Sequence, residues 1–235
     1  MILETMAPQE MIDELHKDYD ELYEKNIRFL DNGGIRNLRR QGAKFPAYVM
    51  KEQRTRRGNH YLCDFLFRKR GDVFSNKVIE SRLCLMQTKE GLAGVSLVLS
   101  GKFKKEVLYI YRPHVFKRYK ERMHLDLDGI ELIRQFDLRN CDTIIHDGYK
   151  HKEGDIENDV MMTITDGALF GTISEVDGAI CYTINTFIAN DTMQEGYKSR
   201  FNRQHNAMVD QIKEELDFFS HGNPDYLFDF KKRKE

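Results

Sequence analysis

The chain lacks the features that would assign it to a class of protein at once. It has only four cysteines in 235 residues, Cys63, Cys84, Cys141 and Cys181, and they form no CxxC pair. This wide spacing argues against a zinc knuckle and against a dense disulfide framework. Cys63 and Cys181 lie in apolar, strand-like runs, where a cysteine is usually a small core residue.

Signatures of membrane insertion and of common enzyme families are also missing. No apolar run is long enough to cross a bilayer, and residues 1–15 do not combine a basic start with an apolar segment as a secretory signal does. There is no P-loop, no GxSxG motif and no GxGxxG motif followed by a helix. We therefore expect a cytoplasmic protein with reduced thiols, no membrane contact, no cofactor and no bound metal.

The net charge of −1 conceals a strong asymmetry. Residues 35–70 contain eleven Lys and Arg against two acidic residues, and residues 102–122 contain eight against two. A basic block inside a neutral protein is typical of a surface that contacts phosphates. The alternative is that the acidic segments, residues 1–34 and 123–235, fold back onto the basic block and neutralise it.

The first half of the chain predicts one helix followed by strands. Apolar residues repeat at three- and four-residue spacing over 8–31, and Asn32-Gly33-Gly34 ends this helix. Segments 47–56 and 60–69 alternate with a period of two around a Gly58-Asn59 turn, which predicts a β-hairpin. Three more strand-like runs follow at 80–88, 93–100 and 105–111.

The second half predicts two helices and a strand meander. Pro113 suits the first turn of a helix over 113–123, because it lacks the N–H that a helix start leaves unpaired. A second helix, capped by Asp126 or Asp128, extends to about Leu138, and an exposed loop follows over 140–157. Asp166-Gly167 and Asp177-Gly178 then join three strands, and a closing amphipathic helix covers 192–219.

These elements predict an α+β protein with a mainly antiparallel sheet. A strand-rich first half precedes the order strand, helix, helix, three-strand meander, helix. We expect an N-terminal amphipathic helix (1–34), a basic strand-rich region (35–104), a domain over 105–190, and a C-terminal amphipathic helix and tail (191–235).

The helix over 113–123 places His114, Arg118 and Arg122 on one face at four-residue steps. A histidine is suited to proton transfer because its usual pKa lies near neutrality, and the planar fork of arginine is suited to phosphate oxygens. The alternative is a solvated basic helix face, or one that holds phosphate without any chemistry.

The residues YIYRPHVFKRYKERM, TDGALFGTI and CYTINTFI, in that order, resemble the RelE-like and BrnT-like toxin domains of the barnase–EndoU–colicin–RelE group. The resemblance covers about residues 105–190. It implies a metal-independent endoribonuclease with catalytic residues at His114, Arg118, Arg122 and Thr186. It also implies an antitoxin-like or self-association partner, which we expect at the terminal helices. The basic first half has no counterpart in those small toxins.

A second group of residues predicts nucleic-acid binding, with RNA favoured over DNA. Arg54, Arg56 and Arg57 lie beside Tyr61 in the hairpin, and Lys117 lies on the basic helix. Arginines near aromatic side chains grip phosphates and stack on bases, although a charged edge strand that resists aggregation has the same composition. The sequence therefore predicts an RNA-binding protein, with toxin-type cleavage as one hypothesis. The alternative is a non-catalytic nucleic-acid-binding or protein-interaction module.

Overall fold

A computed structural model of the protein describes eight stretches of the chain. These are residues 1–36, 38–40, 43–75, 78–100, 105–140, 143–147, 159–176 and 179–192. The predicted helix over 192–219 begins at the last described residue, so it lies outside the described part, as does the Asp177-Gly178 turn.

The described strands form one continuous sheet in the order β1-β2-β3-β4-β5-β9-β8-β7-β6. Neighbours in this described sheet are antiparallel except β5 and β9, which run parallel. The prediction of an α+β protein with a mainly antiparallel sheet is therefore confirmed. The strands are β1 (Ala47–Arg54), β2 (His60–Phe67), β3 (Ile79–Thr88), β4 (Gly91–Ser100), β5 (Lys105–Tyr111), β6 (Ile144–Asp147), β7 (Asp159–Ile164), β8 (Gly167–Val176) and β9 (Ala179–Ala189).

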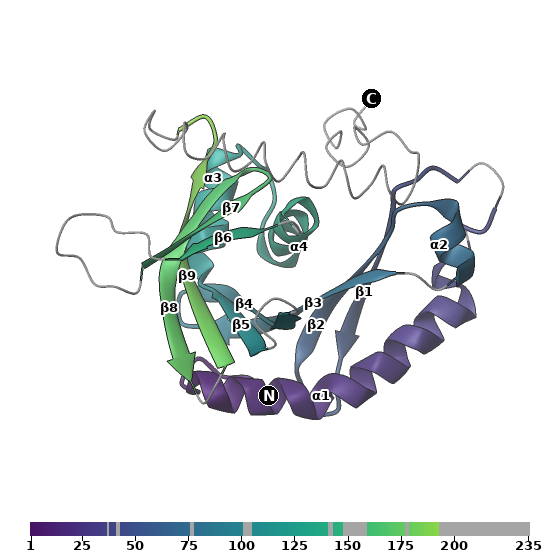
Figure 1. The fold of residues 1–235 in the computed structure, drawn as a ribbon, viewed down its shortest axis with the longest axis horizontal. Coiled ribbons are helices and arrows are strands. Elements are labelled where there is room, and N and C mark those ends of the chain that lie inside the picture. The colour runs from purple at the N-terminus through teal and green to yellow at the C-terminus, as the bar shows by residue number, and fades with distance from the viewer. Residues whose placement is uncertain are drawn as a thin grey trace.

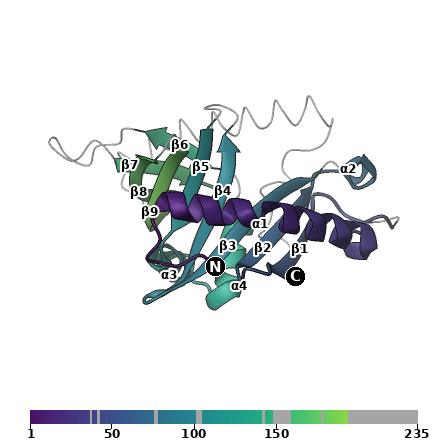
Figure 2. The same ribbon diagram turned by 90° about the horizontal axis from the view of Figure 1, so that it is seen from below.

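The described helices lie on both faces of this sheet. They are α1 (Pro8–Phe29), α2 (Arg70–Ser75), α3 (Pro113–Arg122) and α4 (Gly129–Arg139), and a π-helical turn over Leu30–Gly34 follows α1. The long α1 crosses one face of the strands, while α4 lies on the other side of the curved sheet (Figures 1 and 2). None of these described helices is long and apolar enough to span a membrane.

The alternation of side chains along β2 divides the core into two layers. Tyr61, Cys63 and Phe65 pack with apolar residues of α1, such as Ile12, as the period of two predicts. Leu62 points the other way and packs in the cluster that holds α3 and α4. The sheet is thus covered by helices on both faces. The buried, unpaired thiols of Cys63, Cys84 and Cys181 belong to these layers.

Two elements differ from the sequence-based expectation. The strand β6 falls inside the predicted loop over 140–157, so that prediction was wrong for residues 144–147. Its four residues are too few to show a period, and its pairing with β7 is what makes them a strand. The short helix α2 also has no periodic signal.

The two halves of the chain share one sheet, because β5 pairs with both β4 and β9.

Candidate nucleic-acid interface

Helix α3 is held firmly by its inner side. Val115 and Tyr119 are completely buried, and the Tyr119 ring packs edge-on against Phe187 at 5.2 Å between centroids. The Tyr119 hydroxyl donates a hydrogen bond of 2.6 Å to the Asp166 carboxylate, which also accepts one of 2.6 Å from Arg139 Nε. Burial raises the pKa of Tyr119, so the hydroxyl stays a donor. The outer face of α3 is therefore fixed in position.

On that outer face the structure brings His114 and Arg118 together. Arg118 Nε donates to His114 Nε2 at 3.2 Å, and its Nη1 donates to Glu121 at 3.1 Å. A ring nitrogen that accepts a hydrogen bond carries no proton, so Nδ1 holds the proton of the neutral imidazole. The exposed His114 thus offers a donor to an incoming oxygen. It can take up a proton at Nε2 only after Arg118 releases it.

Arg122 and Thr186 do not join this pair. Arg122 Nη1 donates to the backbone carbonyl of Phe187, which ties the end of α3 to β9. In the register with β8, Thr186 lies opposite Phe170 and Ile184 lies opposite Gly171, so Asn185 is an extra residue in β9. Phe187 faces α3. Because side chains alternate, Thr186 faces away from α3, on the side of Phe170.

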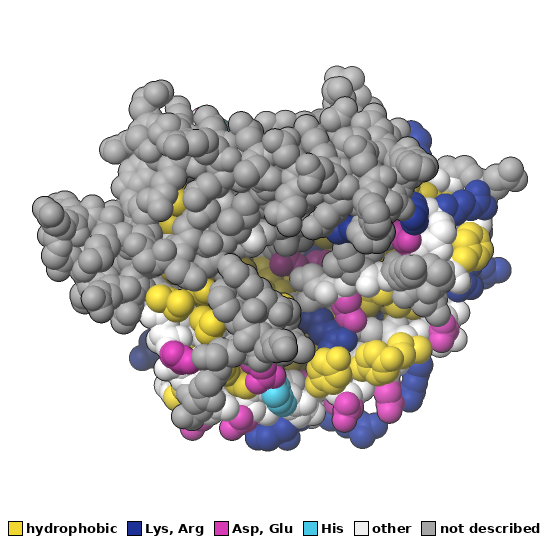
Figure 3. All heavy atoms as spheres, viewed as in Figure 1, with side chains coloured by type: hydrophobic (Ala, Val, Ile, Leu, Met, Phe, Trp, Pro, Cys, Tyr) yellow, Lys and Arg dark blue, Asp and Glu magenta, His cyan; other side chains and the backbone are white. Residues whose placement is uncertain are grey.

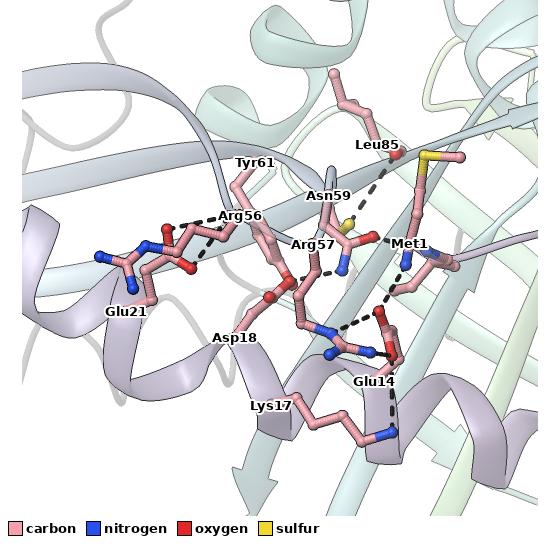
Figure 4. Close-up of polar contacts among 12 residues, drawn as sticks. Met1, Glu14, Lys17, Asp18, Glu21, Arg56, Arg57, Asn59, Tyr61 and Leu85 are labelled. Carbon is pink, nitrogen blue, oxygen red and sulfur yellow. Dashed lines mark hydrogen bonds and ion pairs between the residues drawn. The ribbon is translucent and has the colours of Figure 1, made fainter.

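The predicted arginine patch lies at the β1–β2 turn, where acidic residues of α1 meet it (Figure 4). Arg57 donates to both oxygens of Glu14, at 2.9 and 2.6 Å, and these bonds lower the pKa of Glu14 to about 2. The backbone N–H of Arg56 donates to Glu21 at 3.1 Å. At this end of the sheet the acidic segment does fold back onto the basic one.

Tyr61 must be removed from the set of side chains that could stack on a base. The residue is only 2% exposed, and its hydroxyl donates to the buried Asp18 at 3.0 Å. Its position in β2 turns the ring toward α1, so the expectation of a surface aromatic there does not hold. Arg54 and Lys117 are exposed, and no carboxylate of the described residues forms an ion pair with either.

A pair of buried carboxyl groups lies beneath α4 and was not found from the sequence. Asp64 of β2 is 5% exposed, and neither of its oxygens has a hydrogen-bond donor among the described residues. Burial, and then the charge of Asp137, raise the pKa of Asp64 to about 7, and burial raises the pKa of Asp137 as well. Ser81 Oγ donates to Asp137 at 3.2 Å. The available signal was a single acid inside the apolar run HYLCDFLF.

Comparison of the chain with protein-family models, with curated proteins and with solved structures finds no match. The likeness to RelE-like and BrnT-like toxins therefore rests on the quoted residues alone and stays a prediction. In the part of the chain that the structure describes, no three His, Cys, Asp or Glu side chains are grouped as metal ligands.

Proposed function

We propose that the protein binds RNA through the outer face of α3. The observation that carries this proposal is the exposed row of donors on a rigid helix: Arg112, His114 and Lys117 are exposed, and the Arg118 side chain is 43% exposed. These groups can all donate hydrogen bonds to phosphate oxygens, and the dipole of the helix adds partial positive charge at its start. Glu121 is the acid that offsets part of this charge.

Cleavage of the bound strand is a second function that the contact between His114 and Arg118 supports. A phosphate that draws Arg118 away frees His114 Nε2 to accept the proton of a 2′-hydroxyl. The 2′-oxygen then bonds to the phosphorus while the bond from phosphorus to the 5′-oxygen breaks, and the departing 5′-oxygen takes a proton from water. Arg118 is then placed on the phosphate, where negative charge develops. Thr186 is left out of this proposal because it faces the other side of β9.

Binding is tested by fluorescence anisotropy of a labelled single-stranded RNA across a range of salt concentrations. We expect Lys117→Ala and Arg118→Ala each to weaken binding several-fold, and the slope of log K against log salt to fall by about 0.7 for each lost phosphate contact. The matched control is Lys17→Ala, which removes one exposed charge from α1, on the opposite face of the sheet. Equal effects of all three variants would contradict a site on α3.

Cleavage is tested separately with end-labelled RNA in the presence of EDTA. Product from the wild type but not from His114→Ala would support catalysis at this helix. Binding without any product, or product that persists in His114→Ala, would leave the site as one that binds only.

A further inference from the structure

A second cationic surface lies at the opposite end of β1 and β2 from the arginines of the hairpin turn. It is built from the stretch after α1, the end of β2 and helix α2. We call it the α2 surface and define it by Arg36, Arg39, Arg40, Lys44, Arg68, Lys69, Arg70 and Phe74, which are all exposed. Figure 1 shows α2 above the C-terminal end of α1, and in Figure 3 dark blue and yellow side chains gather at that edge of the molecule.

Contacts between its segments hold the α2 surface together. Arg70 Nη2 donates to the backbone carbonyl of Arg39 at 3.3 Å. Below them Val73 of α2 is completely buried in the same apolar cluster as Ile35, with Leu38 packed against it. Residues that are about 35 positions apart in the sequence therefore form one surface rather than two separate loops.

The arginines of the α2 surface lack the carboxylate partner that Arg57 has at the hairpin turn. None of its five arginines forms an ion pair with a carboxylate of the described residues, whereas Arg57 at the other end is bound by Glu14. The single acid in residues 35–46 and 68–75 is Asp72, which is 7% exposed and accepts a hydrogen bond from the backbone of Lys69 at 3.0 Å. Unpaired exposed arginines attract a polyanion.

Phe74 gives this surface a flat apolar group. Its side chain is 62% exposed on α2, although the neighbouring Val73 is completely buried. A phenyl ring with most of its area in water belongs to none of the apolar clusters of the described residues. Proteins that bind single-stranded nucleic acids combine these two features, a cationic surface and an exposed ring, because the cations bind the phosphates and a base stacks on the ring.

We propose that the α2 surface binds single-stranded RNA, with a base stacked on Phe74 and the flanking phosphates held by its arginines. The choice of ligand rests on the proposed function. Five of the seven cations are arginines, whose planar forks bind phosphate oxygens in pairs and stack on bases. An anionic bilayer fits less well, because α2 has only six residues and cannot form an amphipathic helix that lies in a membrane surface.

The two RNA-binding surfaces are well separated. The start of α3 touches the β3–β4 turn, since Pro113 lies 3.7 Å from the Cβ position of Gly91, and this turn is at the same end of the sheet as the β1–β2 turn. The α2 surface lies at the other end of β1 and β2. The eight residues of each strand span roughly 26 Å, so one RNA strand that reaches both surfaces must extend along the sheet.

The test uses the absence of tryptophan from the sequence. Phe74→Trp introduces a single tryptophan, whose emission can be excited apart from that of the tyrosines, and keeps an aromatic ring at the stacking position. We expect a single-stranded oligo(U) RNA to quench its emission with an affinity close to that of the wild type, measured in parallel by anisotropy. Phe74→Ala should weaken RNA binding by about 5- to 100-fold, the loss expected for one stacked base. Arg40→Ala and Arg68→Ala in the tryptophan background should weaken the quenching, and Lys17→Ala should not.

The outcomes separate this proposal from the proposed function. RNA binding by anisotropy, with no quenching at position 74 and no effect of Phe74→Ala, would overturn the α2 surface as an RNA site and leave binding at α3 intact. No anisotropy change with any form of the protein would overturn RNA binding altogether. A shift in the emission of Phe74→Trp on adding phosphatidylserine vesicles, with no change on adding RNA, would overturn the choice of ligand. Phe74 is exposed, so these variants should fold, which circular dichroism verifies.

Discussion

Replacing Asp64 by asparagine should change how the stability of the protein depends on pH. In the folded chain the Asp64 carboxyl is buried against Asp137 without a hydrogen-bond donor among the described residues, and its pKa is about 7 instead of 3.8. A folded-state pKa above the unfolded value means that the folded protein retains a proton which the unfolded chain releases. This contribution to stability is present below pH 4 and is lost as the pH rises through 7.

The size of the effect follows from the shift in pKa. A difference of about 3 pH units corresponds to roughly 4 kcal/mol of unfolding free energy, lost between about pH 4 and pH 7. Asp64→Asn keeps the shape of the side chain but removes the charge. At pH 8 the variant should therefore be more stable than the wild type, by roughly 2 to 4 kcal/mol, while near pH 4.5 the two should be within about 1 kcal/mol of each other.

Urea unfolding followed by circular dichroism, repeated from pH 4.5 to pH 8, measures this difference. The scan stops at pH 4.5 because Glu14 and Glu52 have lowered pKa values in the folded protein, so their stabilising contribution is lost below that pH. Asp20→Asn, at an exposed site on α1, serves as the control. Parallel pH profiles for the wild type and Asp64→Asn would refute the reasoning.

Two further predictions concern how the site is held in place. Tyr119→Phe removes the hydroxyl that donates to Asp166, while Arg139 and Asn140 still bind this carboxylate. We therefore expect the free energy of unfolding, measured in urea, to fall by about 1 to 2 kcal/mol. An unchanged free energy would mean that this hydroxyl does not hold α3. Gly171→Ala would drive a methyl group into the Thr183 carbonyl across the strand pair and should cost about 3 kcal/mol. Gly71→Ala, with no atom within 4 Å of the new carbon, should change stability by less than about 1 kcal/mol. If Gly171→Ala and Gly71→Ala lost similar amounts of unfolding free energy, the close approach of the Thr183 carbonyl would not be the reason for the glycine at position 171.

The elements themselves were largely predictable from local patterns. The spacing over 8–31, Pro113 at the start of α3 and the Asp166-Gly167 turn each act over a few residues, and the structure confirms α1, α3 and the β7–β8 hairpin. The period of two also placed Cys63 and Phe65 in one layer of the core. These signals are strong because helix and strand geometry fix which neighbouring residues share a face.

The grouping of charged side chains and of the candidate site residues was not predictable in this way. Arg57 and Glu14 are 43 positions apart, and only the packing of α1 across the sheet pairs them. The extra residue in β9 turns Thr186 away from His114, although the resemblance to toxins puts both in one site. A single inserted residue reverses the facing of the side chains that follow it, and no periodic signal reports it.

What the sequence determined by itself is therefore the set of elements, the α+β class and the presence of a strongly basic block. The tertiary structure decided which of those basic residues meet a carboxylate, as Arg57 does at the hairpin turn and Arg118 does on α3, and that the arginines of the α2 surface meet none among the described residues. It also decided that Asp64 meets Asp137 and that Phe74 faces water. The physical reason is that secondary structure follows from neighbours along the chain, whereas charge pairing and burial follow from neighbours in space.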